Sequence, residues 1–215
     1  MNKQNKNNEL KKIILLSGWK GSGKDTAASI LTEHFDFKRI AFADNLKDSV
    51  SKQFGIPRNY FDDRILKESP ILSLPVKPTD KNGIDIVKLF LDELKSKDGK
   101  KSGENLFWTP RALCILEGSV KRAINPDYWV ISAISELSPD KNYVFSDVRF
   151  TSEVNYIKNN IKSHKVIVVR IVRLKSVNTR DPSERDLDNY SFDFVIENKE
   201  TIFDLKSSVE KLLSV

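Results

Sequence analysis

The chain has 215 residues and a formal net charge of +6, and this length suits one medium-sized α/β domain. Cys114 is the only cysteine, so no internal disulfide can form, and no apolar run of about 18 residues predicts a membrane span. We therefore expect a cytoplasmic protein, whose dispersed positive charge suits a pocket for polyanionic ligands better than a dedicated nucleic-acid surface.

Composition at the N-terminus predicts where the folded part begins. Residues 1–9 are polar and rich in Asn and Lys, which predicts a disordered lead-in to a single domain over 10–215. His34 and His164 stand far apart in the sequence and have no clustered cysteines, so no zinc site is expected.

The most informative stretch lies near the start of this domain. Ile13–Leu16 is a short apolar run of the kind found in strands buried on both faces. Gly18-x-x-x-x-Gly23-Lys24 follows, and then an Ala-rich stretch that predicts a helix over 23–35. Strand, glycine-rich loop and helix in this order are typical of a phosphate-binding loop, in which backbone N–H groups and the helix N-terminus bind phosphate oxygens.

The residues after this loop predict nucleotide and metal contacts. Lys24 can reach the β- and γ-phosphates of a nucleotide. Asp25 stands where a Ser or Thr that ligates Mg²⁺ is usual, and Thr26 comes one place later. We expect Asp25 to reach Mg²⁺ directly or through water, and Thr26 to bind a phosphate.

A second strand is predicted over 38–42, followed by a helix to about Phe54 with Asp44 as its N-cap. Lys47 lies one turn into this helix and would face the strand ends, where ligands sit in open α/β sheets, unless it is a solvated surface lysine.

Residues 55–107 read as an insertion between core strands, with an amphipathic helix over 84–94. Within this insertion, the charged segment Asp62-Asp63-Arg64 is the strongest candidate for a functional role. A salt-bridged surface helix is the alternative interpretation.

Trp108-Thr109-Pro110-Arg111 predicts a helix start, with Thr109 as N-cap and Pro110 in the first turn. That helix would end near Ala123, and another would run from Asn125 to Ile134. The aromatic residues of this stretch are expected in the core, with Trp108 the strongest candidate for a ligand contact.

A third strand over 143–146 ends in Asp147-Val148-Arg149. A carboxylate at such a strand end can reach Mg²⁺ or its water shell, and Arg149 can bind a phosphate with two hydrogen bonds. An internal ion pair between Asp147 and Arg149 is the alternative.

The remaining chain alternates helix and strand. The sequence predicts helices over 151–161, capped by Thr151, and 201–213, strands over 166–172 and 192–196, and a polar, Arg-rich loop over 173–190. Strand–helix alternation predicts a five-stranded parallel sheet in a three-layer P-loop NTPase fold of the nucleoside monophosphate kinase type. The insertion and the Arg-rich loop would be its substrate clamp and its lid.

Taken together, these segments resemble the deoxynucleoside monophosphate kinases of bacteriophages and other viruses. The pieces that carry the resemblance are Leu16–Thr26, Phe42–Lys47, Asp63-Arg64, Trp108–Arg111, Asn125–Trp129, Ser146–Arg149, Ser183-Glu184 and Phe194–Asn198. The resemblance implies phosphoryl transfer from Mg·ATP to a deoxynucleoside monophosphate, in the cytoplasm of the cell or of an infected host cell.

The resemblance also assigns roles. The expected catalytic residues are Lys24, Asp147 and Arg149, and the expected metal contacts are Asp25, Thr26 and Asp147. The expected ATP contacts are Gly21, Ser22, Gly23, Lys24, Asp25, Thr26 and Arg180. The expected acceptor contacts are Lys20, Lys47, Arg64, Trp108, Arg111, Arg149 and Glu184. The lid sequence Thr179–Glu184 departs from the His-bearing form of many relatives, so which lid arginine contacts ATP stays open.

Two alternatives remain. Animal phosphomevalonate kinases share the Gly-Lys-Asp loop and a tail much like residues 183–198, although Trp108–Arg111 and Asn125–Trp129 favour the nucleotide branch. The alternative from another class is a nucleotide switch or a nucleic-acid-binding ATPase. We expect small-molecule nucleotides as partners, with no stable nucleic-acid or membrane partner, and leave homodimer formation open.

Overall fold

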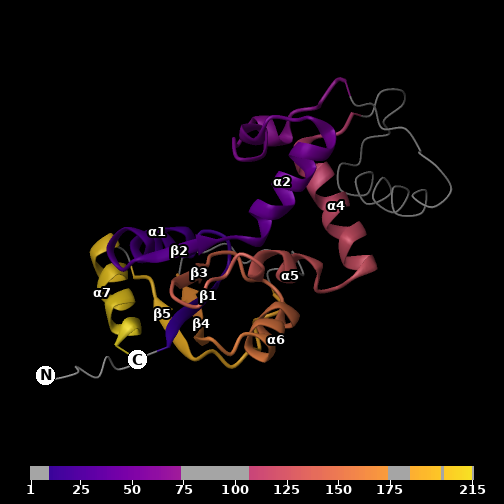
Figure 1. Ribbon diagram of the computed structural model, residues 1–215. Coiled ribbons are helices and arrows are strands. Elements are labelled where there is room, and N and C mark those ends of the chain that lie inside the picture. Colours follow the sequence, from indigo (N-terminus) through magenta and orange to yellow (C-terminus); the bar gives the residue numbers. More distant parts are fainter. Residues whose placement is uncertain (1–9, 74–106, 174–184, 200, 215) are drawn as a thin grey trace, which may run out of the picture. The chain divides into compact units, whose positions relative to one another are not determined.

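The computed structural model describes residues 10–73, 107–173, 185–199 and 201–214. Figure 1 shows its elements coloured along the chain. The strands are β1 (Lys11–Ser17), β2 (Phe37–Ile40), β3 (Asn142–Phe145), β4 (His164–Val172) and β5 (Phe194–Glu197). The α-helices are α1 (Lys24–His34), α2 (Phe42–Phe54), α4 (Pro110–Ile124), α5 (Tyr128–Ile134), α6 (Thr151–Asn160) and α7 (Ile202–Leu213). Two short 3₁₀ helices are η1 (Arg58–Phe61) and η2 (Leu66–Glu68).

The strands form one sheet in the order β2-β3-β1-β4-β5, and all four neighbouring pairs are parallel. In the central strand β1, Ile14 lies opposite Val144 of β3 and Ile167 of β4. Parallel neighbours need crossover connections, which the alternation of strands and helices supplies. The predicted α/β fold with a five-stranded parallel sheet is confirmed.

Side chains of β1 point alternately to the two faces of the sheet, as the period of a strand requires. Ile14 and Leu16 pack in one apolar cluster with residues of α1 and α7, and Ile13 and Leu15 pack in another with residues of α5 and α6. All four side chains are fully buried. Figure 1 shows α1 and α7 on one face of the sheet and α6 on the other. The sheet is therefore the middle of three layers.

The chain divides into two compact units, of which the first comprises residues 1–42 and 130–215 and contains the sheet. The second comprises residues 43–129 and contains the predicted insertion 55–107. Residues 74–106, with the helix predicted over 84–94, lie outside the described residues, as do the predicted lead-in 1–9 and most of the predicted lid.

The second unit has its own apolar core, in which Val50, Phe61, Trp108 and Leu113 are buried. The N–H of Ile71 donates a hydrogen bond of 2.7 Å to the carbonyl of Trp108, which joins two segments far apart in the sequence. No described helix has both the length and the apolar composition needed to cross a membrane.

Helix α4 starts as predicted. Thr109 is its N-cap, and the hydroxyl of Thr109 accepts a hydrogen bond of 3.1 Å from the N–H of Ala112. Pro110 occupies the first turn, where its missing N–H costs nothing.

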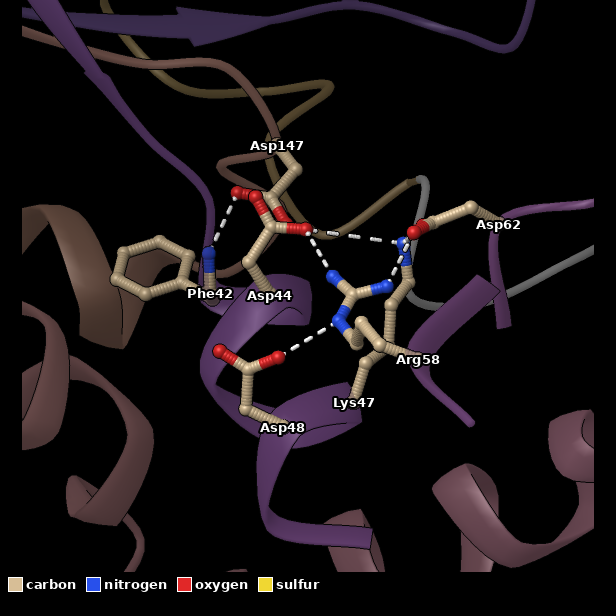
Figure 2. A network of polar contacts seen from close by, with 7 residues as sticks. All are labelled: Phe42, Asp44, Lys47, Asp48, Arg58, Asp62 and Asp147. Carbon is tan, nitrogen blue, oxygen red and sulfur yellow. Dashed lines mark hydrogen bonds and ion pairs between the residues drawn. The ribbon is translucent and has the colours of Figure 1, made fainter. Parts of the chain in front are cut away.

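Two other predicted caps are wrong. Helix α2 begins at Phe42, so Asp44 lies inside the first turn. The carboxylate of Asp147 instead accepts the N–H of Phe42, at 2.9 Å, and the helix starts three residues earlier than an Asp44 cap would allow (Figure 2). Helix α6 has Phe150 as its N-cap, and Thr151 is its first residue. The carboxylate of Glu153 accepts the N–H of Phe150 at 3.1 Å, so the cap comes from the third helical residue.

Candidate active site

The glycine-rich loop joins the carboxyl end of β1 to α1. Gly18, Gly21 and Gly23 all have positive φ angles. A Cβ at Gly18 would lie 2.4 Å from the carbonyl oxygen of Ile171 and 2.6 Å from the hydroxyl of Ser22. Backbone occupies the space that any side chain at Gly18 would need, so this position requires glycine.

Lys24, the first residue of α1, lies across its own loop. Its ammonium group donates hydrogen bonds to the carbonyls of Gly18 at 2.5 Å and Trp19 at 3.0 Å. The carbonyl of Trp19 also accepts the N–H of Ser22, at 3.0 Å. These bonds close the loop into a compact turn with the lysine ammonium at its mouth.

One pocket brings the loop together with the residues after β3. It is lined by Ser17, Gly18, Lys24, Asp147, Val148 and Arg149. Strands β1 and β3 are parallel neighbours, so their carboxyl ends lie at the same edge of the sheet, where open α/β sheets bind ligands. The three residues predicted as catalytic, Lys24, Asp147 and Arg149, thus line a single pocket.

Two acidic side chains hold the backbone after β3, one of them buried and the other exposed. Glu153 is 8% exposed, and its carboxylate accepts the N–H of Arg149 at 2.9 Å as well as that of Phe150. Asp186 accepts the N–H of Thr151 at 2.6 Å. Together these two acids fix the turn that carries Arg149 into the pocket.

Metal binding was predicted at Asp25, Thr26 and Asp147. Asp25 and Thr26 are exposed in the first turn of α1, whereas Asp147 lines the pocket. Within the described ranges, no three His, Cys, Asp or Glu side chains gather as a cage for a metal ion. Mg²⁺ usually takes one or two carboxylates, water and substrate phosphates as ligands. The carboxylate of Asp147, which lines the pocket with Lys24, is an oxygen donor of the kind that Mg²⁺ prefers.

An ionic cluster in the second unit surrounds the predicted acceptor contact Lys47 (Figure 2). The ammonium of Lys47 lies 2.9 Å from the carboxylate of Asp62 and 3.7 Å from that of Asp44. Arg58, which the sequence did not single out, binds Asp44 at 3.0 Å and Asp48 at 2.6 Å, and also pairs with Asp62. The hydrogen bond from Arg58 lowers the pKa of Asp62 to about 2.

The other predicted acceptor contacts differ in exposure. Arg111 is half exposed and pairs with Glu68 at 2.5 Å, and Arg64 is exposed. Trp108 was the aromatic residue predicted to contact the ligand. It is only 8% exposed and packs in the apolar core of the second unit, where the other aromatics of its stretch were expected. Lys20 is exposed in the glycine-rich loop. Arg180 and Glu184 lie outside the described residues, so their roles stay predictions.

Sequence reasoning missed an arginine beside the loop whose side chain is only 11% exposed. Arg170 on β4 pairs with Asp188 at 2.6 Å and donates to the hydroxyl of Ser17 at 3.2 Å. Asp188 also accepts the indole N–H of Trp19, at 3.1 Å, and the Arg170 guanidinium lies 5.7 Å from the centre of that ring. The signal in the sequence was a charged residue among the apolar residues 166–172 of β4.

Asn198, which follows β5, was also missed as a site residue. Its side-chain amide donates a hydrogen bond of 2.8 Å to the carbonyl of Ser22 in the loop. Asn198 entered the sequence analysis only as the last residue of the segment Phe194–Asn198. Its hydrogen-bond partner lies 176 positions away, and no sequence pattern predicts a contact over that separation.

Comparison with known proteins bears on the resemblance. No family model matches this chain. A protein of Acanthamoeba polyphaga mimivirus, named "Putative deoxynucleotide monophosphate kinase", is 29% identical over 203 residues, which cover 92% of this chain and 93% of that protein. Among solved structures, TT1252 from Thermus thermophilus matches with a TM-score of 0.44 and 16% identity, over 95% of this chain and 97% of that one. The resemblance of this chain to viral deoxynucleoside monophosphate kinases, expected from its motifs, is confirmed over most of its length.

Proposed function

We propose that the protein transfers the γ-phosphate of Mg·ATP to a deoxynucleoside monophosphate, giving the diphosphate. One observation supports this above the others: Lys24, Asp147 and Arg149 line one pocket beside the glycine-rich loop. Phosphoryl transfer asks an enzyme chiefly for positioning and for neutralisation of charge, and this pocket offers a lysine, an arginine and a carboxylate for that task. The name of the mimivirus relative points to the same reaction.

The loop and α1 would bind the donor. Backbone N–H groups of residues 21–26 and the positive end of the helix attract the phosphates of ATP. Lys24 exchanges its bonds to the carbonyls of Gly18 and Trp19 for bonds to the β- and γ-phosphates. Asp147, with Asp25 and Thr26, would hold Mg²⁺, which neutralises charge between those two phosphates.

The acceptor needs little activation. The second ionisation of a phosphate monoester has a pKa of about 6, so the attacking oxygen is already charged near neutral pH and no general base is required. Arg149 in the pocket offsets the repulsion between the two anions and aligns them.

Acceptor binding by the second unit would replace existing ion pairs. Lys47 pairs with Asp62, and Arg111 pairs with Glu68. These pairs are partly exposed, and exposed ion pairs contribute only about 0–1 kcal/mol each, so a dianionic phosphate can displace the carboxylates at small cost.

The test is an ADP-release assay with ATP and a panel of acceptors: the deoxynucleoside monophosphates, the ribonucleoside monophosphates and mevalonate phosphate. We expect ADP release that depends on a deoxynucleoside monophosphate and is lost in Lys24→Ala. Release with mevalonate phosphate alone would establish the phosphomevalonate branch instead. ATP hydrolysis that needs DNA, and no acceptor from the panel, would overturn the proposal in favour of a nucleic-acid-binding ATPase.

A further inference from the structure

Asn198 joins the end of β5 to the glycine-rich loop. The residue is 8% exposed, and its own N–H donates a hydrogen bond of 2.8 Å to the carbonyl of Val172 at the end of β4. This bond fixes the backbone from which the side-chain amide reaches the carbonyl of Ser22, also at 2.8 Å. A carbonyl oxygen can only accept, so the group facing Ser22 must be the NH₂ of the amide.

This hydrogen bond sets the orientation of one peptide group of the loop. In a trans peptide the C=O and the following N–H point in opposite directions. Because the carbonyl of Ser22 points at Asn198, the N–H of Gly23 points away from Asn198. Lys24, the next residue, lines the pocket.

Close packing strengthens the same constraint. Gly23 has a φ of +105°, and a Cβ there would lie 2.4 Å from the side-chain nitrogen of Asn198. The next atoms would be Cγ of Asn198 at 3.5 Å and a methyl carbon of Leu205 at 3.8 Å. Asn198 therefore touches the loop at the peptide whose N–H it orients.

We propose that Asn198 is a positioning residue that presets the phosphate-binding conformation of the loop by holding the Gly23 N–H toward the phosphates. This inference rests on the proposed function, because it assigns the loop to a polyphosphate. It adds a residue far outside the loop sequence, acting through the Ser22 carbonyl and touching no substrate itself.

Two substitutions separate the hydrogen bond from the charge. Asn198→Leu keeps a side chain of similar shape, is neutral and cannot donate. Asn198→Asp also cannot donate, but adds a negative charge near the bound phosphates. Thr201→Ala is the matched control, because the Thr201 hydroxyl accepts the N–H of Asp204 at 3.1 Å and so caps α7 three residues along the chain from Asn198.

Calorimetry with inorganic tripolyphosphate, and with ATP, gives the dissociation constants. We expect both Asn198 variants to bind tripolyphosphate about tenfold more weakly or worse, as the loss of one buried hydrogen bond predicts, and Thr201→Ala to bind it normally. The KM for the acceptor at saturating ATP should stay within about twofold in every variant, since Asn198 acts on the donor site. Weakening in Asn198→Asp alone, with normal binding in Asn198→Leu, would overturn the inference, because charge would then explain the effect.

A measurement on the wild-type protein without ligand tests the hydrogen bond even if the variants fail to fold. In the wild-type protein, NMR should find the side-chain amide protons of Asn198 slow to exchange with water, and exchange at the solvent rate would overturn the inference. Absence of tripolyphosphate binding by the wild-type protein would overturn the proposed function as well. Normal wild-type binding with an unchanged Asn198→Leu would overturn only the role of Asn198.

Discussion

The two units hold their functional side chains in different ways. Around the glycine-rich loop of the first unit, the buried side chains of Asn198 and Glu153 bind backbone groups, and the mostly buried Arg170 pairs with Asp188. In the second unit, Lys47 and Arg58 bind carboxylates whose side chains are 36–54% exposed. Buried hydrogen bonds are costly to break, whereas exposed ion pairs are weak and exchange partners readily.

This contrast suggests a division of labour. Under the proposed function, the donor site gains from a loop fixed before binding, because less ordering remains to be done when the triphosphate arrives. Side chains that exchange carboxylates for a phosphate serve better when their present partners are weak. Perturbing the first unit should therefore cost more than perturbing the second.

Lys24→Ala should have the largest effect. Loss of the Lys24 ammonium, which binds the loop and lines the pocket, should lower kcat/KM by about a thousandfold, a typical result when a charged group that stabilises the transition state is removed. The melting temperature should change by less than a few degrees. Lys38→Ala is the control, because Lys38 forms an exposed ion pair with Glu136, at 3.9 Å. Near-normal turnover in Lys24→Ala would remove the loop from the reaction.

Gly18→Ala and Gly21→Ala form the next comparison, read by urea unfolding. Both positions have positive φ, but a Cβ at Gly18 would meet the Ile171 carbonyl at 2.4 Å, whereas nothing lies within 4 Å of one at Gly21. We expect Gly18→Ala to lose roughly 3 kcal/mol or more of the free energy of unfolding, and Gly21→Ala roughly 1 kcal/mol. Equal losses would show that the loop is less tightly packed against β4 than the structure indicates.

The same contrast explains what the sequence could predict. The strand over Ile13–Leu16 and the start of α4 at Thr109 depend on local pattern, and both were predicted. The bond from Asn198 to Ser22 joins residues 176 positions apart, and no local pattern names such a partner. The prediction for Asp44 was wrong for the same reason, because Asp147, 105 positions from Phe42, binds the N–H that a local cap would have bound.

Charged clusters resist prediction in another way. Asp62-Asp63-Arg64 was predicted as a candidate functional segment, but the arginine that pairs with Asp62 is Arg58. Side chains four positions apart in a helical segment are neighbours, as Arg58 and Asp62 are. The sequence offers several such oppositely charged pairs, and exposed ion pairs are too weak for the sequence pattern to predict which one forms.

Arg149→Ala should have a smaller effect than Lys24→Ala. Arg149 lines the pocket, so its loss should raise the acceptor KM and lower kcat, each by about tenfold, while the KM for ATP changes little. Arg149→Lys should recover part of the loss in KM but not in kcat, because an ammonium supplies charge without two parallel hydrogen bonds. Steady-state kinetics at saturating ATP and saturating acceptor make the separation. Unchanged constants in Arg149→Ala would exclude it from the site.

The smallest effect is expected in the second unit, for Asp62→Asn. The pKa of Asp62 in the folded protein is about 2, below the ordinary value of 3.8, so its ionised form stabilises the fold above about pH 4 and this contribution is lost as the pH falls through 2. Because the side chain is 54% exposed, solvent screening should hold the contribution below about 1 kcal/mol. Urea unfolding of wild type and variant at pH 7, 4 and 2 should show a difference that disappears at pH 2. Glu136→Gln, at an exposed ion pair of the first unit, is the control. A loss of several kcal/mol at pH 7 would mean that this cluster is as rigid as the surroundings of the loop, and the contrast between the two units would fail.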